Sequence, residues 1–159
     1  MLIQEQSGQF PVNDNSLPVA VIMQRTTVGG RWPTVKWETQ GVVQDSSEPG
    51  TSSRVIYDDG TRCHILYPGF DIALYREEAE DYYLNLTARE PRIFVLWRQE
   101  EPDPAVPAFV SVSYGKAARW MDAGENVDGV AMAPEVYAWV GQFVEQHYRP
   151  EPKVKRRRT

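Results

Sequence analysis

Apolar and polar residues alternate over much of the first two thirds of the chain, which predicts a series of β-strands. In residues 34–44 the apolar side chains, among them Val35 and Trp37, point to one side and charged or polar ones to the other. This alternation is typical of an antiparallel strand with one face in solvent. Both faces of residues 17–28 carry apolar side chains, so we expect that strand to be covered on both sides. Strands are predicted over residues 17–28, 34–44, 54–57, 62–67, 70–75, 81–87, 92–98 and 108–114.

Glycine and proline pairs mark the breaks between these strands. Gly29-Gly30 ends the first strand, and Pro68-Gly69 is expected to turn the chain after residue 67. Asp59-Gly60 is the strongest hairpin signal, because a type I′ turn needs positive φ at both central residues. Residues 76–80 favour either one helical turn or a charged loop.

The last third of the chain changes to helical periodicity. Residues 115–123 suit a short helix, and a longer amphipathic helix is expected from Pro134 to about residue 149. Proline is favoured at the first position of a helix, where its missing N–H costs nothing. Apolar residues then recur at helical spacing on one face: Val136, Val140, Phe143 and Val144.

Strands followed by helices indicate an α+β fold. We expect an antiparallel sheet or a partly closed barrel of about seven strands, packed by C-terminal helices. Capped barrels of the pleckstrin-homology type are one candidate. The domain organisation expected is a flexible N-terminal segment over residues 1–16, a single domain over 17–149 and a flexible basic tail over 150–159.

Charge is distributed unevenly along the 159 residues, whose formal net charge is −5. Residues 1–152 hold 12 basic and 22 acidic residues, a net charge of about −10, whereas five bases lie between Lys153 and Arg158. Phosphates repel such an acidic body, which disfavours general nucleic-acid binding. The sequence has no apolar stretch of membrane-spanning length and no secretory signal, so we expect a cytoplasmic protein without membrane contact.

The residues that could carry chemistry do not form a catalytic set. Cys63 is the only cysteine, which excludes an intramolecular disulfide, and adjacent strand residues such as Cys63 and His64 point to opposite faces. We therefore place Cys63 in the core. The acidic run Glu77, Glu78, Glu80 and Asp81 lacks a glycine to fold it around a cation, so it is interpreted as a solvated face. Catalytic residues, a metal site and a cofactor are not expected.

Contact with a partner remains as the expected role. Arg31-Trp32 follows the Gly29-Gly30 turn, and exposed Trp and Arg together typify interface hot spots. Burial of Trp32 is an equal alternative. The basic tail is either a solubilising end or a docking segment for an acidic protein, for RNA or for the chain's own body. The candidate partner-binding residues are Arg31, Trp32, Lys153, Lys155, Arg156, Arg157 and Arg158.

An ordered set of residues between about Leu17 and His147 resembles a known family. The set comprises Pro18-Val19-Ala20-Val21, Trp32, Trp37, Gly41-Val42, Tyr83-Leu84-Asn85-Leu86, Pro91, Phe94-Val95, Val112-Ser113, Ala117, Pro134, Trp139-Val140 and Phe143-Val144. It resembles an uncharacterised proteobacterial family, a domain of unknown function commonly encoded beside formate dehydrogenase genes. The resemblance implies an accessory role in making or maturing a molybdenum- or tungsten-dependent formate dehydrogenase, and it implies no catalytic residue.

These observations together predict a non-catalytic adaptor that binds another protein, and the resemblance implies formate dehydrogenase subunits or maturation factors as its partners. The alternative is a small ligand-binding domain or an enzyme whose pocket the sequence does not reveal. A nucleic-acid binder that works through its basic tail ranks third.

Overall fold

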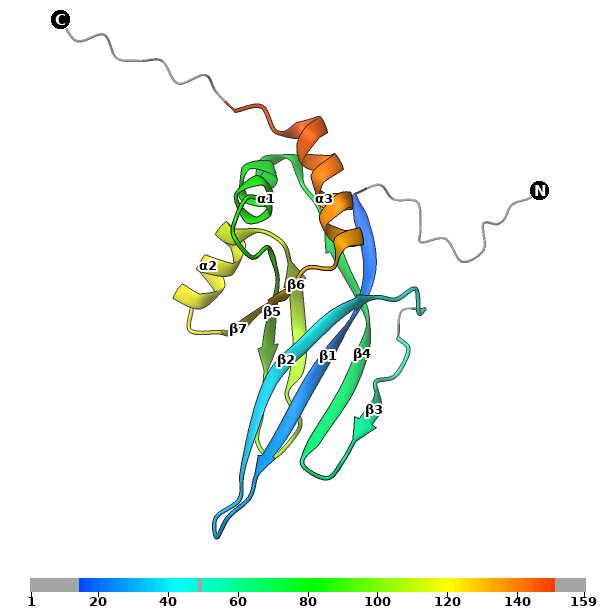
Figure 1. The fold of residues 1–159 in the computed structure, drawn as a ribbon, viewed down its shortest axis with the longest axis vertical. Coiled ribbons are helices and arrows are strands. Elements are labelled where there is room, and N and C mark those ends of the chain that lie inside the picture. The colour runs from blue at the N-terminus through cyan, green and yellow to red at the C-terminus, as the bar shows by residue number, and fades with distance from the viewer. Residues whose placement is uncertain (1–14, 49, 151–159) are drawn as a thin grey trace, which may run out of the picture.

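Two antiparallel sheets and three helices make up residues 15–48 and 50–150, which are the residues that the computed structural model describes (Figure 1). The first sheet has the order β2-β1-β4-β3 and the second the order β6-β5-β7. The first sheet contains β1 (Ser16–Val28), β2 (Thr34–Gln44), β3 (Arg54–Asp58) and β4 (Arg62–Ala73). The second contains β5 (Arg92–Arg98), β6 (Val106–Ser111) and β7 (Asn126–Ala131).

The helices gather at one end of the molecule, and the β1–β2 hairpin projects from the other end (Figure 1). None of the helices in the described part of the chain is long and apolar enough to cross a membrane. The helical elements are the 3₁₀ turn η1 (Arg76–Glu78), α1 (Ala79–Leu86), α2 (Tyr114–Asp122) and α3 (Pro134–His147).

The main core is filled from both sheets and from α1 and α3. Val19, Val21 and Met23 point into it from β1, while Ala20 and Ile22 join a smaller cluster on the opposite face of the same sheet. Both faces of β1 are therefore covered, as its sequence predicted. The four apolar residues predicted for the buried face of the last helix, Val136, Val140, Phe143 and Val144, are all buried.

The α+β class and the antiparallel pairing predicted from the sequence are confirmed. The strands form two separate sheets and not a closed barrel, so a partly closed barrel is not confirmed. One link between the sheets is made by the Tyr67 hydroxyl on β4, which donates a hydrogen bond to the carbonyl of Ala105, just before β6, at 3.2 Å.

The strand predicted over residues 81–87 is wrong, because these residues belong mostly to helix α1. Tyr82 and Leu86, together with Ala79 and Asn85, are buried at a spacing of three and four residues, which is the helical period. Tyr83 and Leu84 are exposed on the other side. The short run fits both periods, and packing against α3 selects the helix.

Three further differences concern the strands. Pro68-Gly69 does not turn the chain: β4 continues through it to Ala73, with an irregularity in its pairing to β1 and a φ of 92° at Gly69. The last strand is β7 over Asn126–Ala131, which the sequence did not reveal because Asp128 and Gly129 are poor strand formers. Residues 112–114 of the predicted strand 108–114 lie outside β6, and Tyr114 begins α2.

Most of the predicted N-terminal segment and basic tail lie outside the described residues, at positions 1–14 and 151–159. The candidate contact residues Lys153, Lys155, Arg156, Arg157 and Arg158 lie there.

Candidate functional site

The end of the β1–β2 hairpin exposes an aromatic side chain. Gly30, with a φ of 141°, provides a backbone conformation in the turn that other residues rarely adopt. Trp32 follows it and is 83% exposed, and Arg31 beside it is also exposed. The alternative in which Trp32 is buried is therefore wrong. Val28 and Val35, close to the turn, are exposed as well, and apolar side chains that gather on a surface mark a candidate interaction site.

A groove lies between the inner face of this hairpin and the loop that joins β5 to β6. Its volume is about 570 Å³, which is within the range of ligand sites. Trp37 and Arg25, which are cross-strand neighbours, lie on the hairpin side. Prolines contribute on both sides. The lining residues are Arg25, Pro33, Thr34, Val35, Trp37, Gln99, Glu101, Pro102 and Pro104.

The loop side of the groove is held in shape by its own hydrogen bonds. The side-chain amide of Gln99 donates to the carbonyl of Asp103 at 3.1 Å, and the backbone N–H of Asp103 donates to the carbonyl of Glu100 at 2.8 Å. These bonds close a turn that leaves the carboxylates of Glu100 and Glu101 exposed. The groove therefore lies between two ordered walls.

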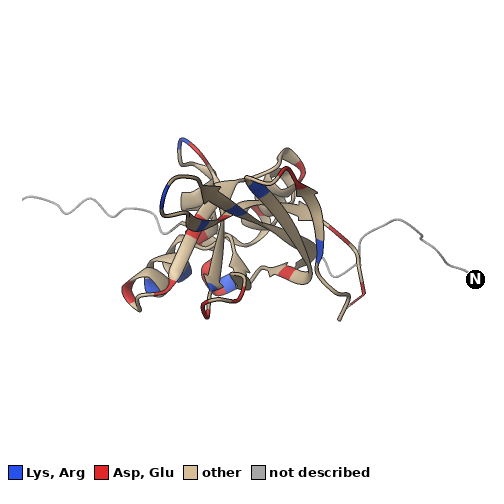
Figure 2. Cartoon of the chain, turned by 90° about the horizontal axis from the view of Figure 1, so that it is seen from below, with Lys and Arg blue, Asp and Glu red and all other residues tan. Residues whose placement is uncertain are grey.

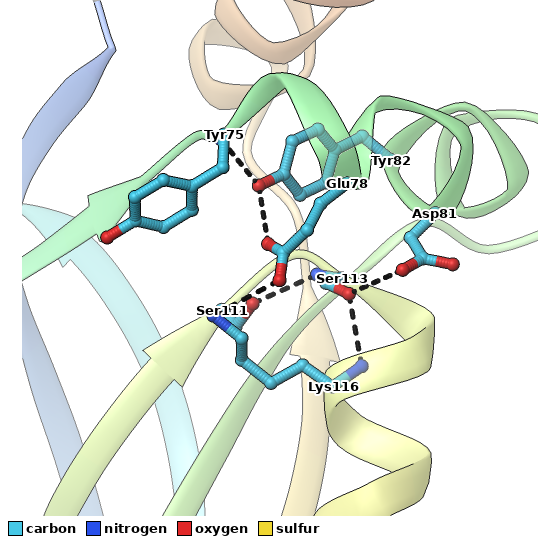
Figure 3. A network of polar contacts seen from close by, with 7 residues as sticks. All are labelled: Tyr75, Glu78, Asp81, Tyr82, Ser111, Ser113 and Lys116. Carbon is cyan, nitrogen blue, oxygen red and sulfur yellow. Dashed lines mark hydrogen bonds and ion pairs between the residues drawn. The ribbon is translucent and has the colours of Figure 1, made fainter.

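A second group of polar residues lies at the helical end, where η1 and α1 meet the start of α2 (Figure 3). Tyr82 is fully buried, and its hydroxyl accepts a hydrogen bond from the backbone N–H of Tyr75 and donates one to Glu78. Glu78 also pairs with Lys116 at 3.4 Å. Burial raises the pKa of Tyr82, which keeps its hydroxyl protonated as a hydrogen-bond donor.

Ser113 and Asp81 continue this polar network at the N-terminus of α2. The Ser113 hydroxyl accepts from the backbone N–H of Lys116, as a helix cap does, and donates to the Asp81 carboxylate at 3.1 Å. Ser113 is fully buried, and its N–H donates to the hydroxyl of Ser111. A Cβ at Gly115 would lie 2.7 Å from Asp81, so glycine makes room for the carboxylate. The network joins two helices and leaves Ser113 no access to a substrate.

The acidic run predicted as a solvated face divides into two pairs. Glu77 and Glu80 are exposed as expected, whereas Glu78 and Asp81 are partly buried and contribute to the network above. Within the described residues, no group of three or more His, Cys, Asp or Glu side chains is placed to hold a metal ion.

Cys63 and His64 point to opposite faces of β4, as predicted from their adjacency. Cys63 is buried, whereas His64 joins a row of side chains that crosses the outer face of the first sheet. In this row His64 Nε2 donates to the Gln24 side-chain oxygen at 2.8 Å, and the Gln24 amide donates to Glu38 at 2.9 Å. The row links β4, β1 and β2, so the pair cannot act as a nucleophile and base.

Two hydrogen-bond centres, one fully buried and one partly buried, were missed by sequence reasoning. Asn85, fully buried, donates to the carbonyls of Arg92 and Val112 and accepts from the N–H of Arg92. Asp128 on β7 accepts from the indole N–H of Trp97 and from the backbone N–H of Thr39. Local pattern gave no signal for either, because the role of each residue is defined by partners on other elements. These partners lie 7 and 27 positions from Asn85, and 31 and 89 positions from Asp128.

Comparison with known proteins identifies the family of the chain. A family model described as a protein of unknown function (DUF3305) matches residues 18–157. No curated protein and no solved structure gives a significant match. Because the family model covers the whole described fold apart from its first three residues, the chain belongs to the DUF3305 family.

Proposed function

We propose that this protein is a non-catalytic accessory protein that binds a partner polypeptide through the end of the β1–β2 hairpin. The observation that carries the proposal is the 83% exposure of Trp32, beside an exposed Arg31. These two residue types are enriched among the side chains that dominate binding energy at interfaces. The groove beside them adds apolar surface that a partner can cover.

The fate of the chemically versatile side chains supports the same proposal. Ser113 is a helix cap, Tyr82 is a buried donor, and Cys63 and His64 face apart. Each is explained by the stability of the fold. Arg31 and Trp32, by contrast, are exposed, and binding to a partner is the activity that suits them.

We further propose that the partner is a subunit or a maturation factor of a molybdenum- or tungsten-dependent formate dehydrogenase. The support is the resemblance to a family commonly encoded beside formate dehydrogenase genes. An accessory role requires a surface that docks and releases, and the exposed hairpin end meets that requirement.

The test is direct binding of the purified chain to formate dehydrogenase subunits and maturation factors from the same source. Trp32→Ala is expected to weaken binding at least tenfold, because loss of a hot-spot side chain costs about 2 kcal/mol or more. Met121→Ala removes an exposed apolar side chain from α2 and should bind like the wild type. Equal binding by Trp32→Ala, or no binding to any of these proteins, would refute the proposal.

A second candidate function, binding of a small ligand, is favoured by the volume of the groove and by the presence of Arg25 and Trp37 in its lining. Screening by thermal shift with nucleotides, pterins and carboxylic acids tests it. A ligand in the groove should raise the melting temperature of the wild type and of Trp32→Ala alike, whereas a shift that depends on Trp32 would point to the hairpin tip.

A further inference from the structure

The two walls of the groove carry opposite charge. We call residues 25–37 the hairpin wall and residues 99–105 the loop wall. On the groove side the hairpin wall carries Arg25, with Arg31 at its tip, and no acidic residue, whereas the loop wall contains Glu100, Glu101 and Asp103 and no basic residue. Both signs of charge are visible when the molecule is viewed from this end (Figure 2).

Within one molecule, the charges of the two walls are not neutralised by ion pairs across the groove. None of the ion pairs of the described residues joins the hairpin wall to the loop wall, and Lys36 approaches Glu38 at 4.0 Å on the outer face of the hairpin. Arg31, Glu100 and Glu101 are exposed, and Arg25 is partly buried in the groove. Two arginines and three carboxylates are therefore available on adjacent surfaces.

The apolar side chains at this end of the molecule form a projecting tip and a recessed groove. The end of the β1–β2 hairpin projects past the loop that joins β5 to β6 (Figure 1), and Trp32 is not among the residues that line the groove of its own molecule. Exposed Val28 and Val35 flank the tip, and Trp37, Pro102 and Pro104 line the groove. An indole at the tip and an aromatic and proline-lined groove behind it are complementary parts of one surface.

A surface with a basic half beside an acidic half is complementary to itself after a rotation of 180°. We propose that two copies of the chain join end to end about a two-fold axis through this surface. Each hairpin wall then lies against the loop wall of the other copy, and each Trp32 covers the groove of the other copy. The occupant is a second copy because a two-fold axis places the basic wall of each copy against the acidic wall of the other.

This proposal does not depend on the identity of the partner proposed above. It adds a regulatory consequence, because the dimer covers the same Trp32 that we assign to partner binding. A partner then has to displace the second copy, and partner binding and self-association should compete.

Sedimentation velocity of the full chain at low salt tests the dimer. The wild type is expected to dimerise, and the dimer should weaken at about 1 M salt, where the Debye length falls to about 3 Å. Arg25→Glu with Arg31→Glu makes both walls acidic, and Glu100→Lys with Glu101→Lys makes both walls basic. Each double variant alone should be monomeric, and an equimolar mixture of the two should form a heterodimer.

Two controls make the result specific. Arg119→Glu reverses an exposed charge on α2 and should leave the dimer unchanged. Trp32→Ala should weaken the dimer at least tenfold without changing the circular dichroism of the monomer. A monomeric wild type at low salt, or a mixture of double variants that stays monomeric, overturns the dimer. Neither outcome bears on binding to formate dehydrogenase, which is measured with a different protein.

Discussion

The Asp128 carboxylate on β7 accepts a hydrogen bond from the backbone N–H of Thr39 on β2 at 2.7 Å and so joins the two sheets. Thr39 lies at a bulge, where the pairing of β2 with β1 passes from Gly41 to Thr39 and leaves Gln40 without an opposite residue. The same carboxylate oxygen accepts from the Trp97 indole N–H at 2.9 Å. The Asp128 side chain thus accepts hydrogen bonds both from the backbone at a strand bulge and from a tryptophan indole.

Asp128→Ala is expected to destabilise the fold by about 2–3 kcal/mol, because it removes hydrogen bonds to a charged acceptor and leaves two donors without their partner. Urea denaturation measures the loss. Asp122→Ala, at an exposed position of α2, should change stability by less than about 0.5 kcal/mol. Similar values for the two variants would contradict the role assigned to Asp128.

Asn85→Leu should cost about 3 kcal/mol or more. The substitution leaves the N–H and carbonyl of Arg92 and the carbonyl of Val112 without the side chain that satisfies them inside the protein. The melting temperature provides the measurement. Asn126→Leu, at an exposed position of β7, is the matched control and should melt close to the wild type.

Gly115 and Asp81 should be coupled. Alanine normally stabilises a helix by about 1 kcal/mol relative to glycine, but its Cβ at position 115 would crowd the Asp81 carboxylate. Gly115→Ala is therefore expected to stabilise the fold in an Asp81→Ala background and to lose that gain in the wild type. A double-mutant cycle should give a coupling of about 1 kcal/mol or more, and additive effects would show that the crowding is relieved cheaply.

Asp59 should make the free energy of unfolding depend on pH in the acidic range. Hydrogen bonds from the backbone N–H of Arg62, the Tyr57 hydroxyl and the backbone N–H of Thr61 lower the pKa of Asp59 to about 2 from an ordinary value of 3.8. A lowered pKa means that the ionised form stabilises the folded state. The contribution is fully present above about pH 4 and disappears as the pH falls through about 2.

The comparison is between the wild type and Asp59→Asn, whose side chain keeps the turn but has no charge to titrate. The difference between their urea midpoints should be constant from neutral pH to about pH 5 and should shrink toward pH 2. A difference that does not vary with pH would exclude this source of acid sensitivity.

Trp32→Ala should leave the stability of the isolated chain within about 0.5 kcal/mol of the wild type, because Trp32 is largely in solvent. Chemical denaturation at high salt, where self-association is suppressed, measures it. A large loss of stability would mean that Trp32 packs on the fold and would remove the basis for assigning it to binding.

Strong local signals predicted much of this fold. Gly29-Gly30, Asp59-Gly60 and Pro134 marked two hairpins and a helix start correctly, because turn and cap chemistry is local. The type I′ turn expected at Asp59-Gly60 is wrong, because Gly60 has a positive φ and Asp59 does not. Segment 81–87 failed, since eight residues of α1 fit two periods and only contact with α3 decides between them. Asp128 escaped notice because its role is defined by Thr39, which lies 89 positions away.

The candidate site was likewise predicted from the sequence only in part. Arg31 and Trp32 were recognised from residue type and the preceding turn, which is information within a few positions. The groove and its opposite wall charges were not predicted, because residues 25–37 and 99–105 meet only when the two sheets are assembled.

Strand β3 is the edge of the first sheet, all five of its residues are exposed, and Val55, Ile56 and Tyr57 form an apolar run along it. Such an edge is a template for uncontrolled aggregation between molecules. In β3, however, the pairing with β4 passes from Val55 to Tyr57 and leaves Ile56 out of register. This one-residue irregularity breaks the even spacing that an incoming strand needs, so it disfavours edge-to-edge pairing between molecules at β3.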